Sequence, residues 1–135
     1  MSKKLKKKCW DYFSKYIRRK YADRDGYVTC ITCGEKRQWN DRIDAGHYIT
    51  RGRLSTMFDE RNVHPQCKGC NGYGGGRLDV YALYLIKTYG KNILKELNEQ
   101  KNRKNFKIKD FEYHDMIDDL KDKLVALDIR DIGNL

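Results

Sequence analysis

The stretch that decides the fold begins with Cys30-Ile31-Thr32-Cys33 and ends with Cys67-Lys68-Gly69-Cys70. Each Cys-x-x-Cys pair places two thiolates in one tight turn, and four thiolates satisfy the tetrahedral coordination that structural zinc prefers. One such pair could also be a redox-active dithiol, but two pairs favour a metal site. The sequence therefore predicts a structural zinc ion with four ligands, Cys30, Cys33, Cys67 and Cys70.

The segment between the two pairs carries the residues that could perform chemistry. Cleavage of a phosphodiester needs a base that activates water and a divalent cation that stabilises charge on the phosphate. His47 is the natural base because imidazole titrates near neutral pH. It lies in a strand-like stretch in which Asp44 and Gly46 share one face while Ala45 and His47 share the other. A lone histidine in a strand is usually structural, but the zinc frame and the nearby carboxylate favour catalysis here.

Helical periodicity marks the two ends of the chain. Apolar residues recur every three or four positions from Cys9 to Tyr21, again from Leu78 to Tyr89, and from Asp110 to Leu127. We expect a basic N-terminal arm and helix over residues 1–26, a zinc-bearing core over 27–90, and a helical extension over 91–135.

Charge and hydropathy limit the partners and the location of this 135-residue chain. Its formal net charge is +10, with lysines concentrated near the N-terminus, which favours a polyanionic partner such as nucleic acid. The alternative for the basic arm is a disordered tail that only improves solubility. No apolar run could span a bilayer, and no apolar segment follows the first lysines as in a signal peptide. We therefore expect a cytoplasmic protein without membrane contact.

Taken together, the motifs resemble those of zinc-bearing HNH endonucleases (His-Me finger, ββα-metal). The shared pattern is Cys-x-x-Cys, a strand with His47, then Asn62, then Cys-x-x-Cys followed by Asn71. The run Asp44-Ala45-Gly46-His47-Tyr48-x-x-Arg51-Gly52 is more similar to the phage NinG/Rap recombination endonucleases. The resemblance covers roughly residues 27–90. It implies an α+β fold in which a small zinc-stabilised ββα-metal core is flanked by N- and C-terminal helices.

The resemblance also implies roles for individual residues. His47 would be the general base, Asn62 would brace the hairpin loop, and Asn71 would help to hold a catalytic Mg²⁺ or Mn²⁺ ion. Many HNH sites carry Asp directly before the base, where this chain has Gly46. Asp44 is the expected substitute ligand, one pleat away on the same face, and His64 is the alternative.

The leading hypothesis is a metal-dependent, structure-selective DNA endonuclease that acts on branched recombination intermediates such as Holliday junctions and D-loops. A homodimer would most simply make paired cuts on opposite strands. The alternatives are a non-specific or site-specific HNH endonuclease, and a zinc-ribbon protein that binds nucleic acid without cutting it. The expected DNA contacts are Lys3, Lys4, Lys6, Lys7, Lys8, Arg18, Arg19, Arg51, Arg53 and Arg61.

Overall fold

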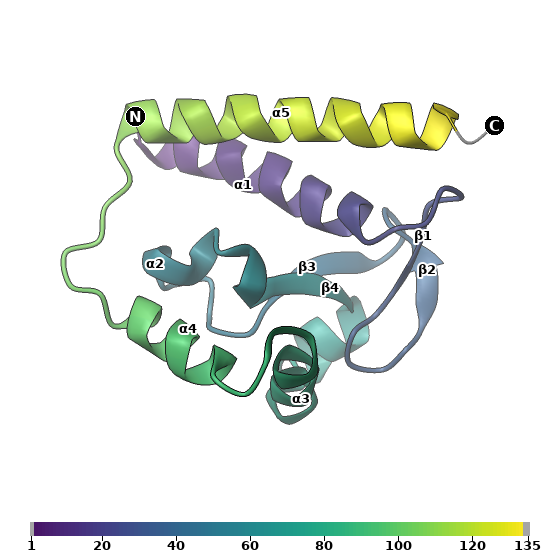
Figure 1. Ribbon diagram of the computed structural model, residues 1–135, viewed down its shortest axis with the longest axis horizontal. Helices are drawn as coiled ribbons and strands as arrows, with labels where there is room; N and C mark the ends of the chain where they lie inside the picture. The colour runs from purple at the N-terminus through teal and green to yellow at the C-terminus, as the bar shows by residue number, and fades with distance from the viewer. Residues whose placement is uncertain (1, 134–135) are drawn as a thin grey trace.

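The computed structural model describes residues 2–133 and has the predicted mixture of helices and small sheets (Figure 1). In chain order its elements are α1 (Ser2–Lys20), β1 (Tyr27–Thr29), β2 (Lys36–Gln38), β3 (Ile43–His47), α2 (Leu54–Met57), the 3₁₀ turn η1 (Glu60–Asn62), β4 (Val63–Cys67), the π turn η2 (Gly69–Tyr73), α3 (Leu78–Tyr89), α4 (Ile93–Lys101) and α5 (Asp110–Gly133). Residue 1 of the predicted N-terminal segment and residues 134–135 of the C-terminal one lie outside this description.

Helix α1 begins well before the predicted start at Cys9, so the basic residues 3–8 are helical and do not form an extended arm. Lysine is a good helix former, and Leu5 packs against the core, which explains the early start. Helix α5 lies beside α1 and runs in the same direction (Figure 1). Arg19 ties the far ends of the two helices together through Asp128 at 2.6 Å and Asp131 at 3.2 Å.

The strands form two separate antiparallel hairpins. β1 pairs with β2, and the chain between them makes the first cysteine turn, in which Gly34 adopts the positive φ of +81° that glycine tolerates best. β3 pairs with β4, with His47 opposite Val63 and Gly46 opposite His64. The second hairpin therefore places the candidate base beside the strand that leads to the second cysteine pair.

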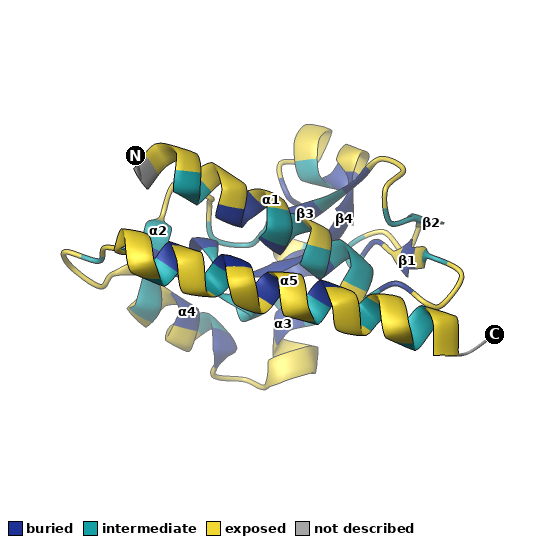
Figure 2. Cartoon of the chain, turned by 90° about the horizontal axis from the view of Figure 1, so that it is seen from above, coloured by how far each residue is buried: buried dark blue, intermediate teal, exposed yellow. Residues whose placement is uncertain are grey.

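Three buried clusters hold these elements together. The largest contains Trp10, Phe13 and Ile17 of α1, Ala45 and Val63 of the second hairpin, and Tyr113, Ile117 and Leu120 of α5. The three predicted segments thus share one core, and Figure 2 shows α5 burying one face on it while the opposite face is exposed. The second cluster surrounds the cysteines, and the third lies between α3 and α4. Within residues 2–133, helices with the length and apolar character needed to cross a bilayer are absent.

Candidate functional site

The four predicted zinc ligands converge on one point. Their sulfur atoms all lie within 4.8 Å of one another, and the sulfurs of Cys33 and Cys67 are 3.7 Å apart. A tetrahedron with Zn–S bonds of about 2.3 Å has edges of about 3.8 Å, so the cluster fits a metal ion such as zinc. All four thiols are free of disulfides, which leaves them available as ligands.

The electrostatics of the cluster also suit a divalent cation. Burial disfavours the Cys30 thiolate, yet hydrogen bonds from Thr32 and neighbouring backbone groups lower its pKa to about 6. The backbone at Glu35 favours the thiolate of Cys33, but burial and contact with the other sulfurs raise its pKa to about 12. Several thiolates in one small volume repel each other, and a bound cation removes that repulsion. The fifth cysteine, Cys9, lies outside this cluster and is fully buried in the largest core, where it packs as a small apolar residue.

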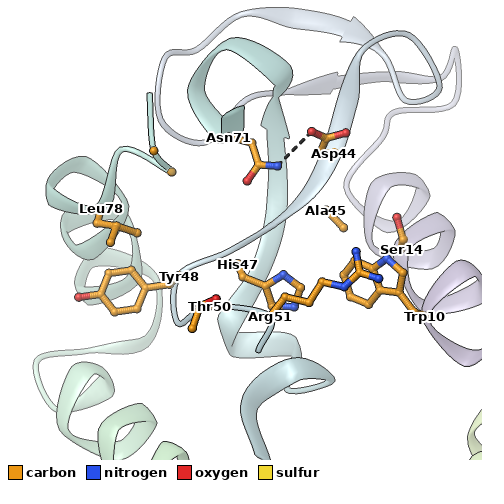
Figure 3. Close-up of a pocket in the computed structure, with 12 residues that line it drawn as sticks. Trp10, Ser14, Asp44, Ala45, His47, Tyr48, Thr50, Arg51, Asn71 and Leu78 are labelled. Atoms are coloured by element: carbon orange, nitrogen blue, oxygen red, sulfur yellow. Dashed lines mark hydrogen bonds between the residues drawn. The ribbon is translucent and has the colours of Figure 1, made fainter. Parts of the chain in front are cut away.

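His47 opens onto a cleft of about 520 Å³ between α1, β3 and η2 (Figure 3). Its Nε2 lies 3.0 Å from the carbonyl oxygen of Met57. A carbonyl can only accept a hydrogen bond, so Nε2 carries the proton and Nδ1 keeps a free lone pair. Burial, and to a lesser extent the charge of Arg51, lowers the pKa of His47, despite the opposing hydrogen bond to Met57. The imidazole is therefore held neutral, in the tautomer that can accept a proton.

Aromatic packing fixes the orientation of this imidazole. The ring of His47 stacks on Trp10 of α1, with 4.9 Å between centroids and 27° between planes. The guanidinium of Arg51 lies 4.8 Å from the same indole ring. Trp10 thus holds both the candidate base and a cation at the edge of the cleft.

Asp44 and Asn71 lie together on the other side of the cleft (Figure 3). The Nδ2 of Asn71 donates to Asp44 Oδ2 at 3.0 Å, which turns the amide oxygen away from Asp44. The Nζ of Lys68 donates to Asp44 Oδ1 at 2.6 Å, so a positive charge already sits at this carboxylate. Asp44 and His47 belong to opposite faces of β3 by strand alternation, but both border the cleft.

Asn62 has no exposed surface and ties together the loop between β3 and β4. Its Oδ1 accepts from the backbone of Ile49 at 2.7 Å, and its Nδ2 donates to the carbonyls of Ile49 at 3.0 Å and Thr56 at 3.1 Å. This loop carries the Met57 carbonyl that orients His47. Asn62 is therefore placed to position the candidate base rather than to touch a substrate.

The sequence model of the protein family described as "Bacteriophage Lambda NinG protein" matches residues 2–129 of this chain. The chain belongs to the NinG family. It is 35% identical over 107 residues to "Protein ninG" of Escherichia phage lambda, which covers 73% of this chain and 50% of that protein. The protein of the same name from Salmonella phage P22 is 34% identical over 108 residues, covering 74% and 51%.

A third relative, "Protein ninG" of Escherichia phage 933W, is 36% identical over 91 residues, covering 65% of this chain and 43% of that protein. The chain thus spans about half the length of the curated relatives it matches. No solved structure gives a significant match.

His64, the alternative ligand for a catalytic ion, does not reach the cleft. It is fully buried, and its Nδ1 and Nε2 lie 3.0 Å and 2.8 Å from the hydroxyls of Tyr81 and Tyr89. Both ring nitrogens are occupied, so the structure disfavours His64 as a ligand and leaves Asp44 as the carboxylate beside Asn71. Burial, with a smaller effect from Lys20, lowers the pKa of His64 to about 4.

Seven of the ten predicted DNA contacts divide into two groups, while Lys4, Lys8 and Arg53 are exposed outside both. Arg51 lines the cleft, and Lys3, Lys6 and Lys7 line a shallow hollow that shares Trp10 and Arg51 with it. In contrast, Arg19 is paired with acidic residues of α5, and Arg61 is bonded to Asp59 and Glu96 at 3.0 Å.

Arg18 donates to backbone carbonyls and lies 5.3 Å from the ring of Trp39. Arg18, Arg19 and Arg61 therefore stabilise the fold through these contacts, which disfavours them as DNA contacts.

Sequence reasoning missed Trp10 and Lys68 as parts of the site. Trp10 belongs to the helical apolar stripe between Cys9 and Tyr21, and nothing in the local sequence indicates which strand it contacts. Lys68 lies inside the second Cys-x-x-Cys pair, where the cysteines dominate the interpretation. Its pairing with Asp44 follows only from the register of β3 against β4, which places Asp44 opposite Gln66.

Proposed function

We propose that this chain is a metal-dependent DNA endonuclease of the HNH type, with His47 as its general base. The observation that carries the proposal is the hydrogen bond from His47 Nε2 to the Met57 carbonyl, which leaves Nδ1 free at a cleft that also holds Asp44 and Asn71. The antiparallel hairpin β3–β4 is followed directly by the helical turn η2, which carries Asn71. This order of elements supports the ββα-metal assignment.

In the proposed reaction His47 Nδ1 takes a proton from a water molecule whose oxygen attacks the scissile phosphorus, and the bond from phosphorus to the 3′ oxygen breaks, which leaves 5′-phosphate and 3′-hydroxyl ends. Met57 and Trp10 keep the imidazole from rotating, and Arg51 is available for a phosphate oxygen. Asp44 and Asn71 are the residues that would hold Mg²⁺ or Mn²⁺, because hard cations prefer oxygen ligands, and the Asn71 amide would have to turn its oxygen towards Asp44 to share the ion. When bound, such an ion supplies charge neutralisation for the phosphate and the leaving oxygen.

The position before the base cannot supply the carboxylate in this chain. A Cβ at Gly46 would collide with the side chain of Gln66, which is fully buried and donates to the Gly76 carbonyl at 2.9 Å. A side chain at position 46 would therefore displace a fixed neighbour. This supports Asp44 as the residue that replaces the aspartate found there in many HNH sites.

The proposed substrate is branched DNA, such as Holliday junctions or D-loops, cut by a homodimer in the host cell cytoplasm. Recognition of phosphates by Lys3, Lys6, Lys7 and Arg51 would depend on shape more than on base sequence. Helix α5 offers an exposed apolar row of Val125, Ile129 and Ile132 on which a second copy could pack.

Cleavage of a labelled four-way junction and of a linear duplex with Mg²⁺ or Mn²⁺ tests the proposal. The wild type should cut the junction in preference, and His47→Ala should lose at least about a thousandfold in rate, since base catalysis and its positioning are both lost. His114→Ala is the matched control, because His114 is exposed on α5.

His47→Ala should still fold and bind DNA. Undiminished cutting by that variant would refute the base assignment. A wild-type protein that binds DNA but never cuts would favour the non-catalytic zinc-ribbon alternative. Equal cutting of both substrates would favour a nuclease without structural selectivity.

A further inference from the structure

A second hollow, of about 580 Å³, adjoins the catalytic cleft. The two share Tyr48, Thr50 and Leu78 as a common wall. Tyr48 directly follows His47, and Figure 3 shows its ring beside Leu78, directed away from the imidazole. A strand that placed a phosphate at His47 would therefore carry its neighbouring nucleotide to the second hollow.

The floor of this hollow is apolar and partly aromatic. Tyr48, Ile49 and Leu94 are half-buried and pack against the core between α3 and α4. The ring of Tyr48 is supported by Tyr81, with 5.6 Å between centroids. Flat nucleobases stack on such surfaces whatever their sequence, because every base has a π face.

The rim of the hollow is cationic. Arg53 precedes α2 and Lys101 ends α4, and the two helices are joined where Ser55 Oγ donates to the Lys101 carbonyl at 3.2 Å and Gln100 Nε2 donates to the Ser55 carbonyl at 3.0 Å. Within residues 2–133, neither Arg53 nor Lys101 has a carboxylate partner within salt-bridge distance. Both cations are thus available to a phosphate.

We infer that this hollow binds one unpaired nucleotide of the DNA strand that crosses the catalytic cleft. The base would lie against Tyr48 and Leu94, and its phosphate would meet Arg53 and Lys101. A base inside a duplex cannot reach such a wall without leaving its partner, whereas an unpaired base at a branch point can. The inference rests on the proposed function, since it places the strand by its scissile phosphate, and it gives a physical source for selectivity towards branched DNA.

The test is a binding measurement that does not depend on cleavage. A duplex with one unpaired 2-aminopurine and the same duplex fully paired are titrated with His47→Ala protein, and fluorescence and anisotropy are recorded. The parent should bind the unpaired form about tenfold more tightly, in line with one stacked base, and change its fluorescence. Leu94→Trp, which fills the hollow, and Lys101→Glu, which reverses the rim charge, should each remove most of that preference.

Lys95→Glu is the matched control, because Lys95 is exposed on the same helix but does not line the hollow. It should keep the preference, and circular dichroism should show that all variants fold. If Leu94→Trp fails to fold, Lys101→Glu alone tests whether the hollow binds the unpaired nucleotide. A preference that survives both substitutions, or an equal loss for paired and unpaired DNA, would overturn the inference. Failure of the proposed function would instead appear as a wild type that binds unpaired DNA but cuts no junction.

Discussion

The regions around His47 and His64 lie on the two strands of one hairpin and differ in how their imidazoles are bonded. His47 donates to one carbonyl and keeps Nδ1 free at a cleft, whereas His64 is enclosed by tyrosines with both nitrogens engaged. Tyr81 donates to the Gly46 carbonyl at 2.8 Å, so it accepts from His64 Nδ1, and Tyr89 donates to Nε2. One histidine is left available to a substrate, and the other is a fully bonded part of the core.

The difference shows that burial alone does not identify a catalytic histidine. Burial lowers the pKa of both imidazoles and keeps both neutral near pH 7. Only an unbonded lone pair next to a water-accessible space distinguishes a candidate base. The two regions are also connected, because Tyr81 bonds both His64 and the carbonyl directly before His47.

The largest expected effect comes from disrupting the cysteine cluster, which stabilises the hairpin that carries both histidines. Cys67 ends the strand that carries His64, so Cys67→Ser should release the metal and unfold this part of the chain. Structural zinc contributes on the order of 10 kcal/mol in small domains, more than the stability of most of them. Zinc content by mass spectrometry and far-UV circular dichroism would measure the loss. Cys9→Ala, outside the cluster, should retain zinc, and a folded, zinc-free Cys67→Ser protein would contradict the prediction.

Truncating each histidine should separate stability from activity. His64→Ala should lower the free energy of unfolding by about 3–4 kcal/mol, because it creates a cavity and removes one buried and one part-buried hydrogen bond. His47→Ala should cost about 1 kcal/mol, since His47 borders open space. Urea denaturation of the two variants would compare these costs. Equal costs would remove the distinction between the two regions.

Titration of His64 should make stability depend on pH. Its pKa is about 4 in the folded protein against 6.5 as the ordinary value, so the unfolded chain binds more protons between these two values. The contribution to stability is full above pH 6.5 and is lost as pH falls towards 4, by about 3 kcal/mol in total. Denaturation midpoints of wild type and His64→Phe between pH 4 and 7 would isolate this effect. An unchanged slope in His64→Phe would assign it to other groups.

The smallest expected effect on cleavage tests the link between the two regions. Tyr81→Phe removes one hydroxyl and leaves the Gly46 carbonyl without that donor, at a cost of about 1–2 kcal/mol. If the hydroxyl helps to position His47, junction cleavage should also fall a few-fold in kcat with little change in KM. Tyr84→Phe is the control, since its ring packs beside His64 but its hydroxyl does not bond to it. Identical kinetics for both variants would limit Tyr81 to a role in stability.

Much of the fold could be predicted from the sequence because its signals are local. The Cys-x-x-Cys spacing identified the four cysteines whose sulfurs cluster in a geometry that could hold a metal ion, and helical periodicity placed α3 from Leu78 and α5 from Asp110. Local sequence signals were insufficient where packing against distant segments of the chain determined the structure. The early start of α1 depends on packing against the core, and the contact of Trp10 with His47 joins residues far apart in the chain.

The sequence by itself determined the composition of the site: four thiols, an imidazole, a carboxylate and two amides in a fixed order along the chain. Only the tertiary structure decided which polar groups satisfy one another. It gave His64 two tyrosine partners from α3 and gave His47 one carbonyl from the loop before β4. Hydrogen-bond partners come from whichever elements pack together, so the free lone pair that could make a histidine a base is a property of the folded chain.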